Sequence, residues 1–294
     1  MATPRRSIEA RRWTALRELP LGHMPPLRSE RVGASSRAAI PSKVLRALNE
    51  GKEESRTLAE WLSIDQPTLL RHSLAAAGLD EHVERLAKLA LGRSELRFTD
   101  RLKASANDLR AVFQSLAAPD SAVRSFATSP SDMVRGWLAY AISFDETLSL
   151  PVRLELSQRF ACDRSMAVRE CAWDALRPHV ARDLDAGIAA LRPWTLHAVD
   201  GIRRCAVEAT RPRGVWCKHI EALKRDPAPG LVLLEPVRSD PSDYVRRSVA
   251  NWLNDASKDQ PTWVRSTCDR WSRESSTKET AWIVHRALRS LGGE

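Results

Sequence analysis

The chain has 294 residues, of which 43% are hydrophobic, and its 46 Lys and Arg outnumber 37 Asp and Glu to give a net charge of +9. This length and apolar content can bury a sizeable core, so a globular protein is expected. No stretch approaches the ~18 apolar residues of a membrane span, and no apolar run follows the N-terminal arginines. We therefore expect a cytoplasmic protein with no signal peptide and no membrane partner.

The cysteines and histidines argue against several kinds of site. The five cysteines form no CxxC pair and are odd in number, so neither a zinc knuckle nor a disulfide framework is indicated. We interpret them as small residues of helix packing. The seven histidines contain no i, i+4 pair, and P-loop, dinucleotide-binding and Ser-His-Asp signatures are missing. We therefore expect no metal and no cofactor.

The positive charge is carried mainly by arginine, whose planar guanidinium forks onto phosphate oxygens. An excess of this kind favours an anionic partner. It leaves DNA, RNA and an acidic protein open as partners.

Residues 1–40 form the most basic segment, with eight Arg against three Glu and little sustained periodicity. We interpret them as a basic, partly disordered arm with one short helix around Ile8 to Leu19. From Pro41 onward, apolar residues recur at three- and four-residue spacing, and no convincing alternating strand pattern appears. Residues 41–294 are therefore predicted to form a single all-α domain.

An internal repeat organises this α-helical region. The segments Met133-Val134-Arg135, Ala167-Val168-Arg169, Gly201-Ile202-Arg203 and Tyr244-Val245-Arg246 each open an amphipathic stretch, and the apolar member recurs after 34, 34 and 43 residues. A period of this size fits one helix–loop–helix unit, because two helices of ~12 residues and two short turns fill it. Such a unit cannot bury its apolar face alone, so the units must stack.

The arginine of each repeat points off the apolar face, so stacking lines up a row of arginines. Neighbouring helices lie ~10 Å apart, and four such arginines would span roughly 30 Å, close to one turn of B-DNA at ~34 Å. The residues predicted to contact DNA phosphates are Arg135, Arg169, Arg203, Arg204, Arg211, Arg213, Arg246 and Arg247.

The four arginines of the Val-Arg segments lie in the first helical turn, where the helix dipole disfavours a cation and calls for a compensating anion. One candidate is local: Asp132, Asp200 and Asp243 lie two residues before the apolar member and can cap the helix or pair with the arginine of the adjacent repeat. The other candidate is a DNA phosphate, bound jointly by arginine and by free backbone N–H groups. Arginine is doubled in Arg203-Arg204 and Arg246-Arg247. In each of these pairs one arginine can pair with a local aspartate, and the other is left for a phosphate.

Carboxylates and tryptophans embedded in the repeats are the candidates for chemistry. Glu208 borders the buried stripe of its helix, and Pro212 ends that helix, so an acid, two arginines and Trp216 are brought together at a corner. Asp255 and Trp252 occupy the same end of the next unit and are expected near that corner.

A purely structural interpretation of this corner is also open. Arg211 and Arg213 would then cap the C-terminus of the helix that contains Glu208. Asp255 would belong to a polar cap before Pro261.

The segments Glu208-Ala-Thr-Arg-Pro-Arg-Gly-Val-Trp216 and Asp240-Pro-Ser-Asp-Tyr-Val-Arg-Arg-Ser-Val-Ala-Asn-Trp-Leu-Asn-Asp255 closely resemble the HEAT-like DNA alkylation repair glycosylase family. With weaker likenesses around Ile40–Gly51 and Thr280–Leu291, the resemblance runs from about Pro41 to Leu291. It implies a curved α-solenoid of HEAT-like hairpins that holds duplex DNA in a concave basic cleft. It also implies excision of N-alkylated purines such as 3-methyladenine, without metal or redox cofactor. We expect a monomer.

The resemblance also implies roles for single residues. Glu208 would stabilise the developing sugar oxocarbenium or orient water, Trp216 would contact the cationic base through its π face, and Asp255 would supply a second anion. The lesion pocket would be completed by Trp173, Asp174 and Trp252. At Trp173 the sequence departs from the family, whose members often carry an acid there, and the adjacent Asp174 would face away by ~100°.

Two functions remain open on this sequence: a monofunctional DNA glycosylase, or a non-enzymatic helical-repeat scaffold that recognises DNA or an acidic protein. Glu208, Trp216 and Asp255 discriminate between them, because a scaffold gains nothing from acids that face and repel a phosphate-binding cleft. If these residues are functional, they must converge and open onto the arginine-lined face.

Overall fold

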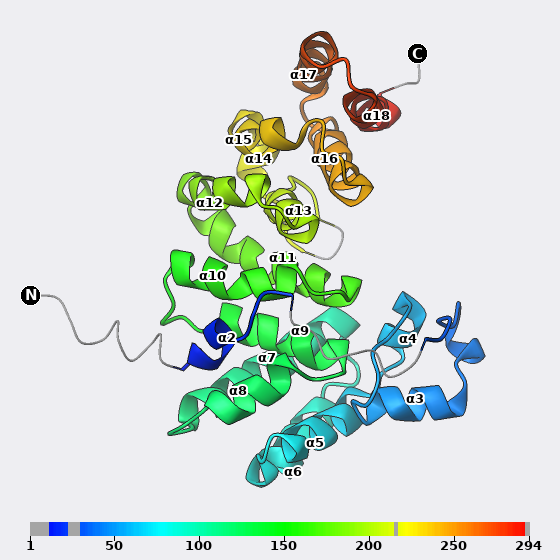
Figure 1. Ribbon diagram of the computed structural model, residues 1–294, viewed down its shortest axis with the longest axis vertical. Coiled ribbons are helices and arrows are strands. Elements are labelled where there is room, and N and C mark those ends of the chain that lie inside the picture. The colour runs from blue at the N-terminus through cyan, green and yellow to red at the C-terminus, as the bar shows by residue number, and fades with distance from the viewer. Residues whose placement is uncertain (1–11, 23–29, 215–216, 292–294) are drawn as a thin grey trace, which may run out of the picture. The chain divides into compact units, whose positions relative to one another are not determined.

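The computed structural model describes residues 12–22, 30–214 and 217–291, and all regular structure within these ranges is helical (Figure 1). The predicted all-α helical-repeat fold is therefore confirmed. The chain divides into two compact units, unit 1 up to Ala175 and unit 2 from Leu176, and the boundary falls inside helix α11 (Met166–Arg182). The single domain predicted for residues 41–294 stays a prediction. None of the described helices is both long and apolar enough to cross a membrane.

Unit 1 is built of helices packed around α9, whose residues are buried along its whole length. Helices α7, α8 and α10 pack directly against α9, and α5 and α6 pair with each other. The helices of unit 1 are α2 (Thr14–Glu18), α3 (Ser42–Asn49), α4 (Leu58–Leu62), α5 (Gln66–Ala76), α6 (Asp80–Leu91), α7 (Phe98–Ser115), α8 (Asp120–Ala127), α9 (Asp132–Ser143) and α10 (Leu150–Ala161), with a 3-10 turn η1 (Arg37–Ala39).

The turn between α5 and α6 illustrates how local chemistry sets these hairpins. Asp65 caps the start of α5 by accepting a hydrogen bond from the Thr68 backbone N–H at 2.8 Å. At the other end Gly78 has a φ of +70°, which lets the Leu79 N–H reach the Leu74 carbonyl at 2.9 Å. This is a Schellman motif, in which glycine supplies the left-handed residue that ends the helix.

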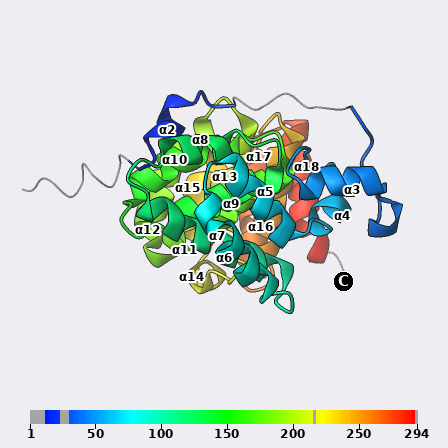
Figure 2. The same cartoon turned by 90° about the horizontal axis from the view of Figure 1, so that it is seen from below.

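Part of the expected basic arm is packed onto unit 1. Helix α2 lies within the helix predicted for Ile8 to Leu19, of which residues 8–11 lie outside the described ranges. Trp13 is fully buried and donates its indole N–H to Asp145 at 3.0 Å, while Arg17 forks onto Glu155 of α10. Helix α2 accordingly lies beside α8 and α10 (Figure 2). Residues 12–22 therefore add to the hydrophobic core of unit 1.

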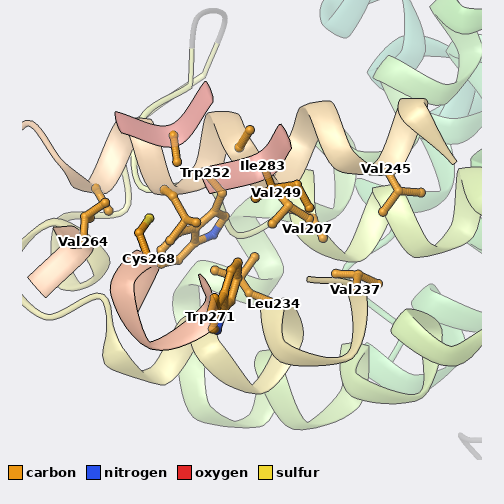
Figure 3. Close-up of a cluster of buried hydrophobic side chains, with 14 of the residues drawn as sticks. Val207, Leu234, Val237, Val245, Val249, Trp252, Val264, Cys268, Trp271 and Ile283 are labelled. Carbon is orange, nitrogen blue, oxygen red and sulfur yellow. The ribbon is translucent and has the colours of Figure 1, made fainter. Parts of the chain in front are cut away.

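Unit 2 places three helices, α13, α16 and α18, side by side in one layer, because α16 packs against both α13 and α18 (Figure 1). Its hydrophobic core lies between this layer and α15 with α17, and includes Val207, Val249, Trp252 and Trp271 (Figure 3). The elements of unit 2 after α11 are α12 (Leu184–Leu191), η2 (Arg192–Leu196), α13 (Asp200–Glu208), α14 (Glu221–Arg225), η3 (Ala228–Gly230), α15 (Leu231–Leu234), η4 (Glu235–Val237), α16 (Asp243–Ala256), α17 (Pro261–Glu274), α18 (Lys278–Ala287) and η5 (Leu288–Ser290).

Candidate functional site

The repeated arginines of the Val-Arg segments are held by the repeats themselves. Arg135 is fully buried, forks onto Asp163 at 2.7 and 3.0 Å, and also reaches Glu54 at 2.6 Å. Arg203 shows the same arrangement two repeats further along the sequence, with Asp240 at 2.6 and 2.9 Å. Each arginine also donates to two backbone carbonyls of the loop before its own helix. Each of these side chains therefore connects the loop before its own helix to an aspartate further along the chain.

The expectation that Arg135 contacts DNA phosphate is therefore wrong, because its guanidinium has no exposed surface and no free donor direction. Arg169 and Arg246 likewise donate to the two carbonyls that precede their helices. For Arg169, Arg203 and Arg246 a phosphate contact stays a prediction.

The aspartates that pair with these arginines differ from those expected. Asp132 and Asp200 accept hydrogen bonds from the hydroxyls of Ser165 and Ser242, at 3.1 and 2.7 Å. None of the three helices concerned has a side-chain cap at its N-terminus. For Arg135 and Arg203 the paired aspartate lies instead five residues before the apolar member of the next repeat, so the local interpretation holds there with a different aspartate. Asp243 pairs with Arg246 and Arg247 of its own helix.

Glu208 and Asp255 come together in unit 2, where one arginine bridges them. Glu208 is 2% exposed, accepts a hydrogen bond from Ser248 Oγ at 2.6 Å and receives Arg211 Nη1 at 3.1 Å on its other oxygen. Asp255 is 6% exposed, and its Oδ2 lies 2.9 Å from Arg211 Nε and 2.7 Å from Arg211 Nη2. Arg204 completes the cluster, with Nη2 3.5 Å from Glu208. The predicted convergence of these two acids is present in the structure.

Local sequence explains why this cluster forms. Arg204 and Glu208 lie four residues apart on α13, and Ser248 and Asp255 lie seven apart on α16, so each pair occupies one face of its helix. Glu208 is the last residue of α13, where the helix dipole disfavours a carboxylate. The chain turns at Pro212, which cannot continue the helix, and this turn places Arg211 between the two acids.

The electrostatics of the cluster centre on Arg211. Burial alone would lower the pKa of its guanidinium, but Glu208 and Asp255 on either side raise that pKa above its ordinary value. Lys258 Nζ lies 3.6 Å from Asp255 Oδ1 and adds a further cation. Two nearly buried carboxylates thus form ion pairs with three neighbouring cations, namely Arg204, Arg211 and Lys258.

A polar stripe on α16 extends this cluster, and sequence reasoning missed most of it. Tyr244, Ser248, Asn251 and Asp255 follow at spacings of four, three and four residues, which places them on one face of α16. Lys258 continues the spacing two residues beyond the end of the helix. Tyr244 carries the Arg204 guanidinium 4.3 Å from its ring centroid. The spacing was the signal that could have identified this face, because polar residues at i, i+4, i+7 mark the side opposite the core.

Two predicted site residues have other surroundings. Trp252 is fully buried and donates its indole N–H to the Thr210 carbonyl at 3.0 Å, and Gly230 packs so closely that a Cβ there would lie 2.3 Å from the ring (Figure 3). The expectation that Trp252 lines a lesion pocket is wrong, because its ring belongs to the core. Trp216 lies outside the described residues.

Trp173 and Asp174 belong to unit 1. The Trp173 indole donates to Glu170 at 2.9 Å. Asp174 is 6% exposed and accepts the Tyr140 hydroxyl and the Lys103 ammonium, each at 2.6 Å. Asp174 is therefore a buried acid paired with a lysine. The role of Trp173 and Asp174 in lesion binding stays a prediction.

The remaining predicted phosphate contacts are paired with acids at the surface. Arg213 forks onto Asp259 at 2.8 and 3.0 Å, and Arg247 lies 2.7 Å from Asp243 while its side chain stays 64% exposed. Exposed pairs of this kind are weak and exchange partners readily. No group of His, Cys, Asp or Glu within the described ranges could hold a metal ion.

The fold and this cluster define a helical-repeat protein with paired carboxylates on an otherwise arginine-rich face. No family model matches the chain. It is 44% identical over 117 residues to the uncharacterized protein YhaZ of Bacillus subtilis (strain 168), a match that covers 40% of this chain and 32% of that protein.

Among solved structures, the chain resembles the Pseudomonas fluorescens alkylpurine DNA glycosylase AlkC bound to DNA containing an abasic site analog, with a TM-score of 0.62 and 26% identity. This likeness covers 76% of our chain and 62% of AlkC. AlkD2 from Streptococcus mutans also matches, with a TM-score of 0.46 and 19% identity over 76% of our chain and 97% of that one. The chain thus spans less than two thirds of AlkC and about a third of YhaZ.

Proposed function

We propose that this chain is a DNA repair N-glycosylase that excises cationic N-alkylated bases, of the 3-methyladenine type, from duplex DNA. The observation that carries the proposal is the Glu208–Arg211–Asp255 cluster, in which two nearly buried carboxylates share one guanidinium. A surface that only binds phosphate gains nothing from such acids, because they repel the ligand and cost several kcal/mol each to desolvate. The likeness to an alkylpurine DNA glycosylase supports the same conclusion.

The chemistry fits a carboxylate pair. An N-alkylated base carries a positive charge, so the C1′–N bond can break with its electron pair neutralising the departing base. Positive charge then develops on the sugar, and a nearby carboxylate stabilises it. Glu208 would face this oxocarbenium and orient the water whose oxygen bonds to C1′, and would accept the proton that the water loses. Asp255 would supply the second anion.

Arg211 would act as a positioning residue in this reaction. In the free protein its guanidinium is the cation between the two acids and pairs with both of them, which fixes their separation. A cationic base entering the cluster competes for the same two carboxylates. A neutral base offers no such compensation, so the cluster would favour alkylated over normal bases.

The experiment is release of free methylpurine from methylated duplex DNA, measured by chromatography after incubation with the purified full chain. Wild-type protein should release the base, and Glu208→Gln or Asp255→Asn should lower the release while binding to the duplex persists. Glu221→Gln, which removes an exposed acid from α14, should leave release unchanged. The proposal fails if the wild-type protein releases no base.

A scaffold that binds DNA or an acidic protein without catalysis is the second candidate. It is favoured by Trp173, whose indole is bonded to Glu170 at a position where the resembled family often carries an acid. Salt-sensitive DNA binding without base release would support this candidate, because phosphate contacts release counterions whether or not a bond is cleaved.

A further inference from the structure

Helix α18 and the turn η5 carry a basic row that no predicted site residue includes. Trp282, Arg286 and Arg289 lie at i, i+4 and i+7, which places them on successive turns of one face. Both arginines are exposed, and neither forms an ion pair with any residue that the structure describes. This row differs from the arginines of the Val-Arg segments, whose guanidinium groups are occupied by neighbouring loops.

The row is fixed against α16 by specific contacts. Arg289 Nη2 donates to Asn251 Oδ1 at 3.0 Å, and its Nη1 donates to the Arg286 carbonyl at 2.6 Å. The guanidinium of Arg286 lies 5.6 Å from the Trp282 ring centroid, and that of Arg246 lies 5.8 Å from the same ring. A cation–π contact of this kind limits where the guanidinium can point. The cations are thus ordered before any ligand arrives.

Positive charge accumulates at this row. Burial and the charge of Arg286 lower the pKa of Arg289, the charge of Asp255 raises it, and the charge of Arg211 lowers it, so two further guanidinium groups act on Arg289 against one carboxylate. Asn251 and Asp255 are four residues apart on one face of α16, so Arg289 contacts that face ~6 Å along the helix from Asp255.

We propose that Arg286 and Arg289 form a binding site for a backbone phosphate of duplex DNA, next to the base held at Glu208 and Asp255. Asn251 and Trp282 orient the two guanidinium groups. The planar fork of arginine suits phosphate oxygens, and both groups keep donors directed to solvent. The choice of duplex DNA as the ligand rests on the proposed function. The positive charge of the two arginines favours a phosphodiester.

The test is the salt dependence of binding to an undamaged, fluorescein-labelled DNA duplex, measured by anisotropy between 50 and 200 mM salt. Each phosphate contact contributes about 0.9 to the slope of log K against log salt concentration, so Arg286→Gln/Arg289→Gln, which removes the one proposed contact, should reduce the slope by about 0.9. Over this fourfold change in salt, the loss of affinity in the variant should be roughly three- to fourfold smaller than the loss in the wild type. Arg286→Lys/Arg289→Lys keeps both charges and should retain the slope.

The matched control is Arg225→Gln/Arg273→Gln, which removes two exposed charges from α14 and α17, outside the α13, α16 and α18 layer. Its slope should equal that of the wild type. The phosphate site is overturned if the slope is unchanged in Arg286→Gln/Arg289→Gln, or falls equally in the control.

These outcomes are independent of catalysis. A reduced slope in a protein that releases no methylpurine would retain the phosphate site and reject the glycosylase. Base release with an unchanged slope would do the reverse. If the surface instead binds an acidic protein, the slope should be unchanged in Arg286→Gln/Arg289→Gln and no base should be released.

Discussion

Arg211 Nη2 lies 2.7 Å from Asp255 Oδ2, across a separation of 44 residues in the sequence. The same guanidinium donates to Glu208, three residues before it. This contact joins the end of α13 to the end of α16 and brings the two acids into one cluster.

Replacing Arg211 by Ala should cost about 3–5 kcal/mol of unfolding free energy, because it leaves two nearly buried carboxylates without their shared cation. Denaturant unfolding at neutral pH measures the loss. The matched control is Arg213→Ala, whose partner Asp259 is partly exposed and which should cost about 0–1 kcal/mol. Equal losses for the two variants would mean that Arg211 does not compensate buried charge.

Replacing Arg135 by Ala should lower the free energy of unfolding by about 3–5 kcal/mol, since Asp163 and Glu54 would lose a fully buried partner. The salt dependence of DNA binding should stay as in the wild type, because this guanidinium never reaches solvent. Both are measurable on one preparation, by denaturant unfolding and by anisotropy. A stable variant with a reduced salt slope would restore Arg135 as a phosphate contact.

The stability of unit 1 should depend on pH through Asp132. Burial, opposed by hydrogen bonds from Ser55 and by the charge of Arg135, raises the pKa of Asp132 from 3.8 to about 6. The folded state then holds the proton more tightly than the unfolded state, so this contribution is fully present below pH 4 and is lost as the pH rises through 6.

Asp132→Asn cannot lose a proton and should lack this decline. The unfolding free energy of the variant relative to the wild type should therefore rise by about 2–3 kcal/mol between pH 4 and pH 7. Unfolding curves at the two pH values measure the change. A difference that is constant with pH would show that Asp132 titrates alike in the folded and unfolded protein.

Trp252→Ala should destabilise the protein by about 3–5 kcal/mol, because it empties a core position packed against Gly230 and removes a bond to Thr210. Once the folded fraction is allowed for, binding to alkylated duplex should match that of the wild type. A stable variant with weakened lesion binding would return Trp252 to the lesion pocket.

The fold was predictable because its signals are local. The recurrence of Val134, Val168, Ile202 and Val245 at helical-repeat spacing gives helices that must stack, and each of these residues is indeed buried. The motif from Glu208 to Asp255 likewise indicated which acids meet, since both lie at corresponding ends of successive repeat helices.

The partners of individual side chains were not predictable, because they depend on contacts between distant segments. Arg135 reads like the other repeat arginines in sequence, yet Glu54 and Asp163 close over it from 81 and 28 residues away. Trp252 looks like a site aromatic until Gly230 brings a backbone against its ring. The row formed by Arg286 and Arg289 carries no motif, and only the packing of α18 against α16 gives it a place beside Asp255.

The central claim is that Glu208 acts on the sugar as its bond to the base breaks. The most direct measurement is the single-turnover rate of methylpurine release from methylated duplex DNA, for wild type and Glu208→Gln, at protein concentrations that saturate binding. Glutamine can still accept the Ser248 hydrogen bond but carries no charge and cannot take a proton. The account predicts a rate at least ~10²-fold lower for the variant with similar DNA affinity. Release at the wild-type rate by Glu208→Gln would contradict it.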